Sequence, residues 1–283
     1  MNAKSSSIQA LYDLSKKTFT PSVTLQPSPQ AIHKLSSLLD TIGPEDVGLK
    51  DESQEDERGH GLFGINVFNR VDRWAQPITY VDIYEGQSFT VTPLARCAYF
   101  ASPLPRLFLC MITPGMTVLS KVLYGSLHVK GYDWVEPPCI RKSEQTGQPA
   151  VRLAKLSVDR VVTAPCGPSV LYPKSGGNLH CFTAVTPCAV LDILAPPYDE
   201  AAGRRCTYYH DYPYSSFGAG NEDAIVNGKE DEYAWLTATD TPDNLYMRSG
   251  RLEIPSCQNL HLRRNPSMFP SKIVGKSCYW AVY

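Results

Sequence analysis

A series of short segments with alternating apolar and polar residues places the strongest constraint on this fold. Residues 78–85 (Ile-Thr-Tyr-Val-Asp-Ile-Tyr-Glu) alternate as a half-buried strand does. Further strand-like runs, separated by proline, glycine or asparagine, lie at residues 116–124, 126–132, 151–156, 160–163, 169–172, 180–185 and 189–194. Many short strands with little helix between them favour an all-β barrel or double-sheet jelly roll over an α/β fold.

The regions before and after this series of strands have different sequence patterns. Ser28 and Pro29 are typical of a helix start. Apolar residues then recur at helical spacing, at Ile32, Leu35, Leu38, Leu39 and Ile42. Residues 199–232 are loop-rich and aromatic, and the end of the chain shows no period. We therefore predict a helical or disordered extension over residues 1–60, one barrel domain over 61–254 and a divergent tail over 255–283.

Charge and cysteine content exclude several classes of protein. The formal net charge is −1, which excludes a nucleic-acid binder that works by bulk charge and offers little to an anionic membrane surface. No apolar run is long enough for a transmembrane helix, and Met1 to Ala10 lack the apolar core of a secretory signal. The nine cysteines include no C-x-x-C pair, so they fit reduced intracellular thiols better than a structural zinc site.

A glycine-rich turn delivers one histidine onto a predicted strand. Gly167, Pro173, Gly177 and His180 match the pattern G-x5-P-x-G-x2-H-x3-N, the second motif of the cupin superfamily, with two extra residues between the proline and the glycine. Ala184 stands at the position of the final asparagine. The resemblance implies a cupin barrel in which His180 is a metal ligand.

The first cupin motif, G-x5-H-x-H-x3-4-E-x6-G, is present as a frame without its ligands. If Gly125 is its last glycine, the glutamate position is Val118 and the two histidine positions are Met111 and Thr113. Valine in place of glutamate points to cupins whose metal is held by three neutral histidines and no carboxylate.

Longer strings resemble the plant cysteine oxidases, cupin thiol dioxygenases related to cysteamine dioxygenase. They lie at residues 114–130, 132–134, 163–167, 172–173, 175–178 and 191–198, with 206–208 and 233–236 extending them. The resemblance implies a mononuclear Fe(II) enzyme. Its substrates are proteins with an exposed N-terminal cysteine, which it oxidises with O2 to cysteine sulfinic acid. In plants these substrates are transcription factors of the low-oxygen response, and the oxidation commits them to degradation.

The same resemblance suggests roles for four residues. His180 is the one metal ligand present, and Asp192 is a pocket acid that orients the substrate or the iron-bound group. Tyr198 and Cys206 are further pocket candidates. The alternative for Asp192 is a charge at the barrel rim; for Tyr198 and Cys206 it is packing and a loop thiol.

The family pattern breaks just before Pro114. Family members carry Pro-Leu-His-Asp-His at this point, whereas the present chain reads Leu-Cys-Met-Ile-Thr over residues 109–113. If the codons that encode this stretch are read from the third base of each codon, they permit the sequence His-Asp-His. The same shifted reading frame resembles the family sequence from Ala98 to residue 113. We therefore hypothesise that residues 91–113 are an out-of-frame translation. A transcript whose only open frame encodes the written residues would refute this hypothesis.

Two classes of function remain open for the chain as written. It is either an iron-dependent thiol dioxygenase, or a degenerate, metal-free cupin that acts as a binding or regulatory protein. A sugar- or auxin-binding cupin is a weaker third class, because the thiol-dioxygenase strings are specific. We expect the protein in the cytoplasm and nucleus, with no direct nucleic-acid or membrane partner.

Overall fold

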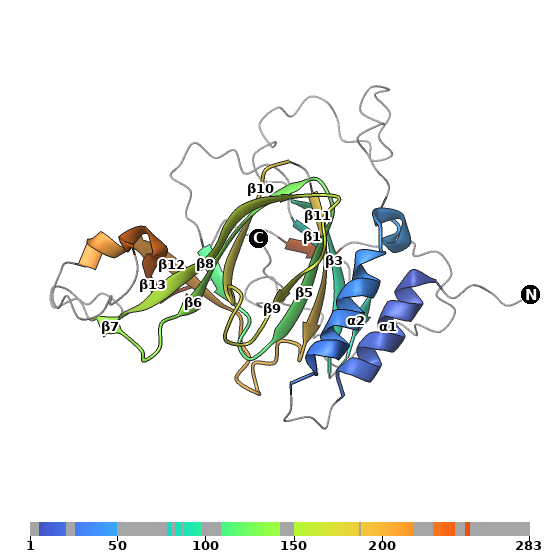
Figure 1. The fold of residues 1–283 in the computed structure, drawn as a ribbon, viewed down its shortest axis with the longest axis horizontal. Helices are drawn as coiled ribbons and strands as arrows, with labels where there is room; N and C mark the ends of the chain where they lie inside the picture. Colours follow the sequence, from blue (N-terminus) through green and yellow to red (C-terminus); the bar gives the residue numbers. More distant parts are fainter. Residues whose placement is uncertain are drawn as a thin grey trace, which may run out of the picture.

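The strands expected from the alternating pattern form two sheets (Figure 1). The computed structural model describes residues 6–20, 26–49, 78–80, 83–86, 88–97, 109–141, 150–186, 188–217, 229–240 and 247–249. The first sheet contains β1 (Ile78–Tyr80), β2 (Tyr84–Glu85), β3 (Thr90–Cys97), β5 (Thr117–Tyr124), β9 (Ser169–Leu171), β11 (Cys188–Ala195) and β14 (Met247–Ser249). Its strand order is β14-β1-β3-β11-β5-β9, with β2 beside β3.

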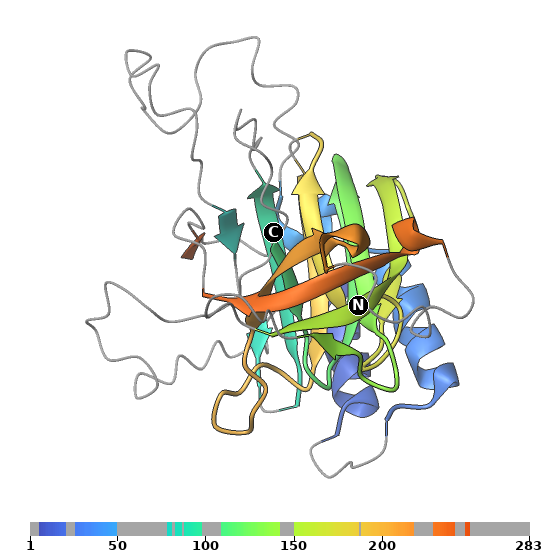
Figure 2. The ribbon, with the colours of Figure 1, turned by 90° about the vertical axis from the view of Figure 1, so that its left-hand side faces the viewer.

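The second sheet closes on itself into a six-stranded antiparallel barrel. It contains β4 (Leu109–Ile112), β6 (Ser126–Trp134), β7 (Ile140–Arg141), β8 (Val151–Thr163), β10 (Leu179–Ala184), β12 (Thr207–Pro213) and β13 (Tyr233–Thr239). The order is β13-β12-β4-β10-β6-β8-β7, and β13 also pairs with β8, which completes the ring. In Figure 2 the orange β13 runs across the upright strands of the first sheet. The predicted all-β cupin fold is therefore confirmed.

Two expectations about individual strands were wrong. Residues 151–163 form the single strand β8, because a β-bulge opposite Gly131 and Tyr132 absorbs one extra residue and interrupts the alternation. The region 199–232, expected as loop, contains β12 and the short 3-10 helices η4 (Tyr214–Phe217) and η6 (Glu230–Glu232). The pairing of β12 with β4 and β13 is non-local, so local sequence does not reveal it.

The N-terminal helices pack on the outer face of the first sheet. They are α1 (Ser7–Thr18) and α2 (Pro29–Asp40), followed by the 3-10 helix η1 (Pro44–Val47). Ser6 and Ser28 cap α1 and α2 by accepting hydrogen bonds from backbone amides. The helices and sheet share one apolar core, in which Leu35 is fully buried and Leu119 of β5 lies on the sheet side. The predicted borders near residues 60 and 254 lie outside the described residues.

Replacement of Leu35 by alanine tests whether these helices belong to the folding unit. Leu35 has no exposed surface, and its truncation leaves a cavity that the surrounding core refills only in part. We expect Leu35→Ala to lower the free energy of unfolding by about 2 to 5 kcal/mol. Urea denaturation provides the measurement, with the exposed neighbour Lys34→Ala as control. Equal stability of both variants would show that the helices fold apart from the barrel.

Alternate residues of each strand of the first sheet face either the helices or the second sheet. On β11, Leu191 and Ile193 belong to the core under the helices, whereas Val190 belongs to the core between the sheets. Asp192 has the same parity as Val190, so it faces the interior between the two sheets. The polar residue that the sequence singled out therefore lies inside the molecule.

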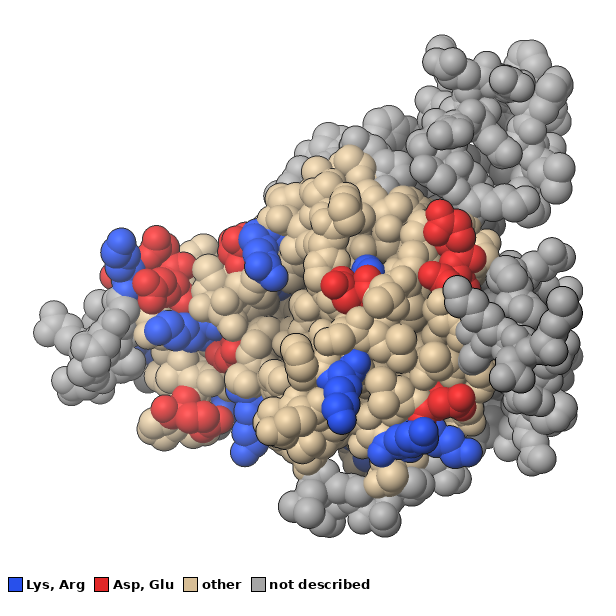
Figure 3. All heavy atoms as spheres, turned by 45° about the vertical axis from the view of Figure 1, so that its right-hand side comes forward, with Lys and Arg blue, Asp and Glu red and all other residues tan. Residues whose placement is uncertain are grey.

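Charged side chains are dispersed over the face of the molecule shown in Figure 3. Lysine and arginine alternate with aspartate and glutamate there, and the view shows no broad patch of one sign. Among the described residues no helix has the length and apolar character needed to span a membrane.

Candidate functional site

The turn before β10 is held by one carboxylate. Gly176 and Gly177 have φ values of +88° and +85°, which an L-residue with a side chain rarely adopts. The backbone amides of Gly176, Gly177 and Asn178 all donate hydrogen bonds to the carboxylate of Asp133, at 3.0 to 3.1 Å. A Cβ at Gly177 would lie 3.2 Å from the Cα of Gly131, so the turn also packs tightly on β6. This arrangement fixes where β10, and with it His180, begins.

His180 has the environment of a metal-ligating histidine. Its side chain points between the sheets, only 2% of the residue is exposed, and Nδ1 lies 3.2 Å from the carbonyl oxygen of Asn178. A carbonyl can only accept, so Nδ1 carries the proton and Nε2 carries the lone pair. Burial lowers the pKa of His180 from 6.5 to about 4, so the imidazole is neutral at physiological pH.

The two predicted histidine positions lie beside His180, as the motif frame requires. Met111 on β4 is the direct antiparallel partner of His180 on β10. Thr113 follows the end of β4, and its hydroxyl accepts a hydrogen bond from the Asn178 side-chain amide at 2.9 Å. Met111 and Thr113 are 3% and 2% exposed, so both are enclosed with His180.

These residues do not fit an iron site of three histidines. A thioether is a soft donor and a neutral threonine hydroxyl is a poor one, whereas non-haem Fe(II) takes imidazole and carboxylate. Within the described ranges no group of three His, Cys, Asp or Glu side chains is placed to hold a metal ion. The residues present supply one of the three imidazoles that the motif expects.

Asp192 lies on the opposite wall of the same interior. It is 1% exposed, and its strand β11 lies between β3 and β5. Its antiparallel partners are Thr92 on β3 and Ser120 on β5. Paired residues of adjacent strands share a face, so these three polar side chains form a row that faces the interior between the two sheets. The rim position considered for Asp192 is thus excluded, while its role in orienting substrate stays a prediction.

Tyr198 and Cys206 lie together, with Tyr208 as a third member. The pKa of Tyr198 is raised well above 10, mainly because the hydroxyl is buried. The neighbouring Cys206 is the second cause, and Tyr208 and Asp192 also raise this pKa. The Tyr198 hydroxyl donates to the Ile112 carbonyl at 3.3 Å, which ties this cluster to β4. Cys206 is 4% exposed, so it is not a loop thiol at the surface. Whether these side chains contact substrate stays a prediction.

Sequence reasoning missed three residues that shape this site. Tyr208 is the partner of Met111 on β12, so Met111 lies between Tyr208 and His180. The spacing Cys-x-Tyr could have indicated it, because residues two apart in an extended segment share a face, and both pack in the same core. Asp133 and Asn178 were noticed only as parts of family strings. Their turn-holding and linking contacts join segments far apart in sequence.

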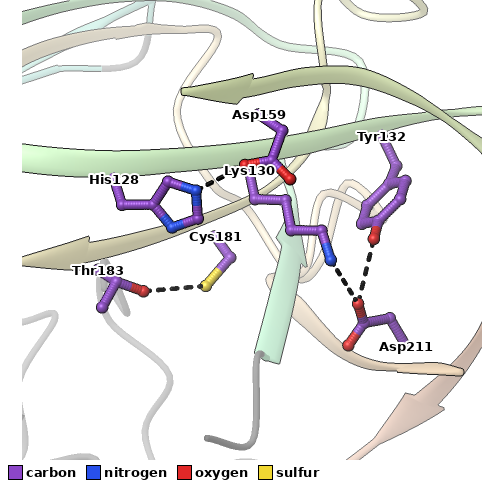
Figure 4. A network of polar contacts seen from close by, with 7 residues as sticks. All are labelled: His128, Lys130, Tyr132, Asp159, Cys181, Thr183 and Asp211. Carbon is purple, nitrogen blue, oxygen red and sulfur yellow. Dashed lines mark hydrogen bonds and ion pairs between the residues drawn. The ribbon is translucent and has the colours of Figure 1, made fainter. Parts of the chain in front are cut away.

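A second polar cluster lies on the other side of β10, away from His180. Figure 4 shows Lys130 and Tyr132 both reaching the carboxylate of Asp211, at 3.3 and 3.1 Å. A cavity of about 410 Å³ opens beside these three residues. Cys181 precedes Phe182 on β10 and faces this cluster, and burial raises the pKa of its thiol to about 11.

The other histidines in the described ranges do not complete the His180 site. His128 lies on the face of β6 that also carries Lys130 and Tyr132, away from His180, and its Nε2 lies 2.6 Å from Asp159 (Figure 4). It is thus a paired sheet residue. His210 packs edge-on against Tyr212, and His33 is exposed on α2. His60 and His261 lie outside the described residues.

The low pKa of His180 makes stability depend on pH. The unfolded chain binds a proton at the ordinary pKa of 6.5, while the folded chain binds it only near pH 4. The contribution of His180 to the free energy of unfolding is therefore constant above about pH 6.5. It falls as the pH drops from there towards 4. We expect a loss of about 2 to 3 kcal/mol between pH 7.5 and 4.5. Urea unfolding at both values measures it, and the loss should be smaller by this amount in His180→Gln; identical pH dependence in the two proteins would contradict it.

Comparison with known proteins places this geometry in a family. The family model PCO_ADO matches residues 38–256. Plant cysteine oxidase 2 of Arabidopsis thaliana is 41% identical over 232 residues, which cover 81% of this chain and 75% of that protein. Plant cysteine oxidase 1 of the same plant is 38% identical over 237 residues (82% and 73%). The 2-aminoethanethiol dioxygenase of Homo sapiens is 30% identical over 204 residues (67% and 68%).

The matched region includes every described strand of both sheets, the glycine turn and His180. Its extent agrees with the resemblance seen in the sequence strings, and membership implies a metal cofactor. The chain therefore belongs to the PCO_ADO family of thiol dioxygenases and is, by family, a cysteine dioxygenase.

Proposed function

We propose that this fold serves the iron(II)-dependent oxidation of an exposed N-terminal cysteine to cysteine sulfinic acid by O2. The substrates are regulatory proteins, foremost transcription factors of the low-oxygen response, and the product marks them for degradation. The enzyme works in the cytoplasm and nucleus, with no direct contact to nucleic acid or membrane. The observation that carries this proposal is the buried His180, whose Nδ1 is held by Asn178 and whose strand partner is a predicted ligand position.

The residues of this chain divide the task between two walls. His180 would hold the metal from β10, and Fe(II) would supply the redox chemistry with O2 when bound. On β11, Asp192 lies opposite and can accept a hydrogen bond from the α-ammonium group of a terminal cysteine. The buried Cys206 and the partly buried Tyr198 line the interior between the walls. The chain as written lacks the two further metal ligands, because Met111 and Thr113 stand at the histidine positions of the motif.

Mass spectrometry of a short peptide tests the proposed substrate class. The test uses a variant in which the family reading, ending Pro-Leu-His-Asp-His at residues 109–113, replaces the written residues. We expect this variant to add two oxygen atoms to a peptide with an N-terminal cysteine and none to a peptide with cysteine at the second position. Equal oxidation of the two peptides would contradict specificity for the chain terminus. Enrichment of the protein in a membrane fraction would contradict the proposed compartments.

The second candidate is a metal-free cupin that acts as a binding or regulatory protein. One observation favours it for the chain as written: the Asn178 amide donates to both the hydroxyl and the carbonyl of Thr113. This pair satisfies polar groups at a ligand position without a metal. Iron content of the purified chain as written distinguishes the two candidates.

A further inference from the structure

Strands β4 and β10 and the residue just before β12 place soft donor atoms on one wall of the interior. Met111 on β4 pairs with His180 on β10 and with Tyr208 on β12. Cys206 lies two residues before Tyr208 and, like Met111, belongs to the apolar core between the sheets. A thioether on β4, an imidazole on β10 and the thiol of the residue just before β12 thus lie around the same buried core.

The protonation and burial of these groups suit a soft, low-valent cation. The contact of His180 Nδ1 with Asn178 leaves the lone pair on Nε2, as a metal ligand requires. Met111, His180 and Cys206 are 3%, 2% and 4% exposed, so water competes poorly with them as a ligand. Thiolate and thioether donors select Cu(I), while Fe(II) prefers harder ligands.

We propose that the chain as written binds one Cu(I) ion through Met111, His180 and Cys206. The Cys206 thiol releases its proton to solvent as the Cu–S bond forms, and no electron is transferred. The inference is independent of the proposed function, because Met111, which stands where the family motif has an iron-binding histidine, is one of the proposed copper ligands. The Tyr198 hydroxyl interacts with Cys206 and contacts the Ile112 carbonyl, so it holds the cysteine against β4.

The chain supplies matched controls for each sulfur ligand. Cys181 neighbours His180 in sequence but faces the opposite side of β10, in the core around Tyr132. Met116 is fully buried, but it lies in a different core, with Val118 and Leu171. Substitutions of Cys181 and Met116 therefore show the effect of losing a buried cysteine or methionine that lies away from the proposed site.

Anaerobic titration of the full chain with Cu(I) against a chromogenic Cu(I) chelator tests the proposal. We expect one equivalent to withstand the chelator. Met111→Leu, His180→Gln and Cys206→Ser should each weaken it by more than about 100-fold, because even loss of a ligand's hydrogen-bond partner costs about 10- to 100-fold. Cys181→Ser and Met116→Leu should stay within about threefold of the parent. An affinity for Cu(I) that Cys206→Ser or Met111→Leu leaves unchanged would overturn the assignment.

X-ray absorption of the one-equivalent complex gives a second readout that does not depend on affinity. The proposed site requires two sulfur neighbours and one imidazole nitrogen around copper. A spectrum with sulfur ligands alone would assign the metal to other cysteines and overturn the proposal. Circular dichroism of each variant shows whether a lost site reflects a lost fold; for a variant that unfolds, the absorption spectrum of the parent decides.

Discussion

Histidines at positions 111 and 113 are expected to give this chain the iron site that its written sequence lacks. The strand and its register are already in place, since Met111 pairs with His180 and Thr113 contacts the same turn. We expect Met111→His/Thr113→His to take up close to one Fe(II) per chain and to gain oxygen consumption with an N-terminal cysteine peptide. The chain as written should show negligible iron and negligible turnover, because one imidazole does not hold Fe(II) against water and buffer. The measurements are anaerobic Fe(II) loading, metal analysis and an oxygen electrode.

Ile112→His supplies the matched control, because residue 112 lies between the two positions and its side chain packs with Tyr132 on the other face of β4. It adds a histidine to the same strand without adding a ligand. A chain with the shifted reading at residues 98–113 should behave like the double variant. Stoichiometric iron and full turnover in the chain as written would show that another residue completes the site. His128 points away and is paired with Asp159, so His60 would then be the first residue to replace.

Asp192→Asn is expected to remove most turnover from the iron-loaded double variant and to leave its iron content unchanged. The carboxylate faces the interior between the two sheets, on the wall opposite His180, and lies close enough to Tyr198 to affect its ionisation. An amide of the same shape keeps the packing but removes the charge that orients a cationic group. We expect kcat to fall by about 10- to 100-fold, the range typical of polar groups that surround a metal site without binding the metal. Steady-state oxygen consumption and metal analysis on the same samples separate the two quantities.

Ser120→Ala is the control for Asp192→Asn, because Ser120 is the partner of Asp192 on β5 and faces the same interior. Its buried hydroxyl has no hydrogen-bond partner within the described ranges, so its loss should change turnover little. Unchanged kcat in Asp192→Asn would remove the aspartate from the set of functional residues. Loss of iron together with activity would assign it a role in folding or metal binding.

Local patterns predicted most of the strands but only part of the site. Strand-like apolar runs identified β5, β6, β10 and β11, of which β5 and β11 are buried on both faces, and helical spacing identified α2. The site residues Met111, Thr113 and His180 followed from motif spacing, because the motif encodes a strand register. Asp133 could not be predicted in its role, since its carboxylate holds a turn more than forty residues away in sequence. β12 was missed for the same reason: its hydrogen bonds go to strands far along the chain.

The double pairing of β13 has a consequence for how the protein is made. Until residues up to Thr239 have left the ribosome, β8 and β12 each present an edge whose backbone amides and carbonyls lack the partner strand. Such open edges recruit strands from other nascent chains. Translation that stops before Tyr233 would therefore yield an aggregation-prone polypeptide that already contains His180, Asp192, Tyr198 and Cys206. Solubility of this protein should thus change sharply over the few codons that encode β13.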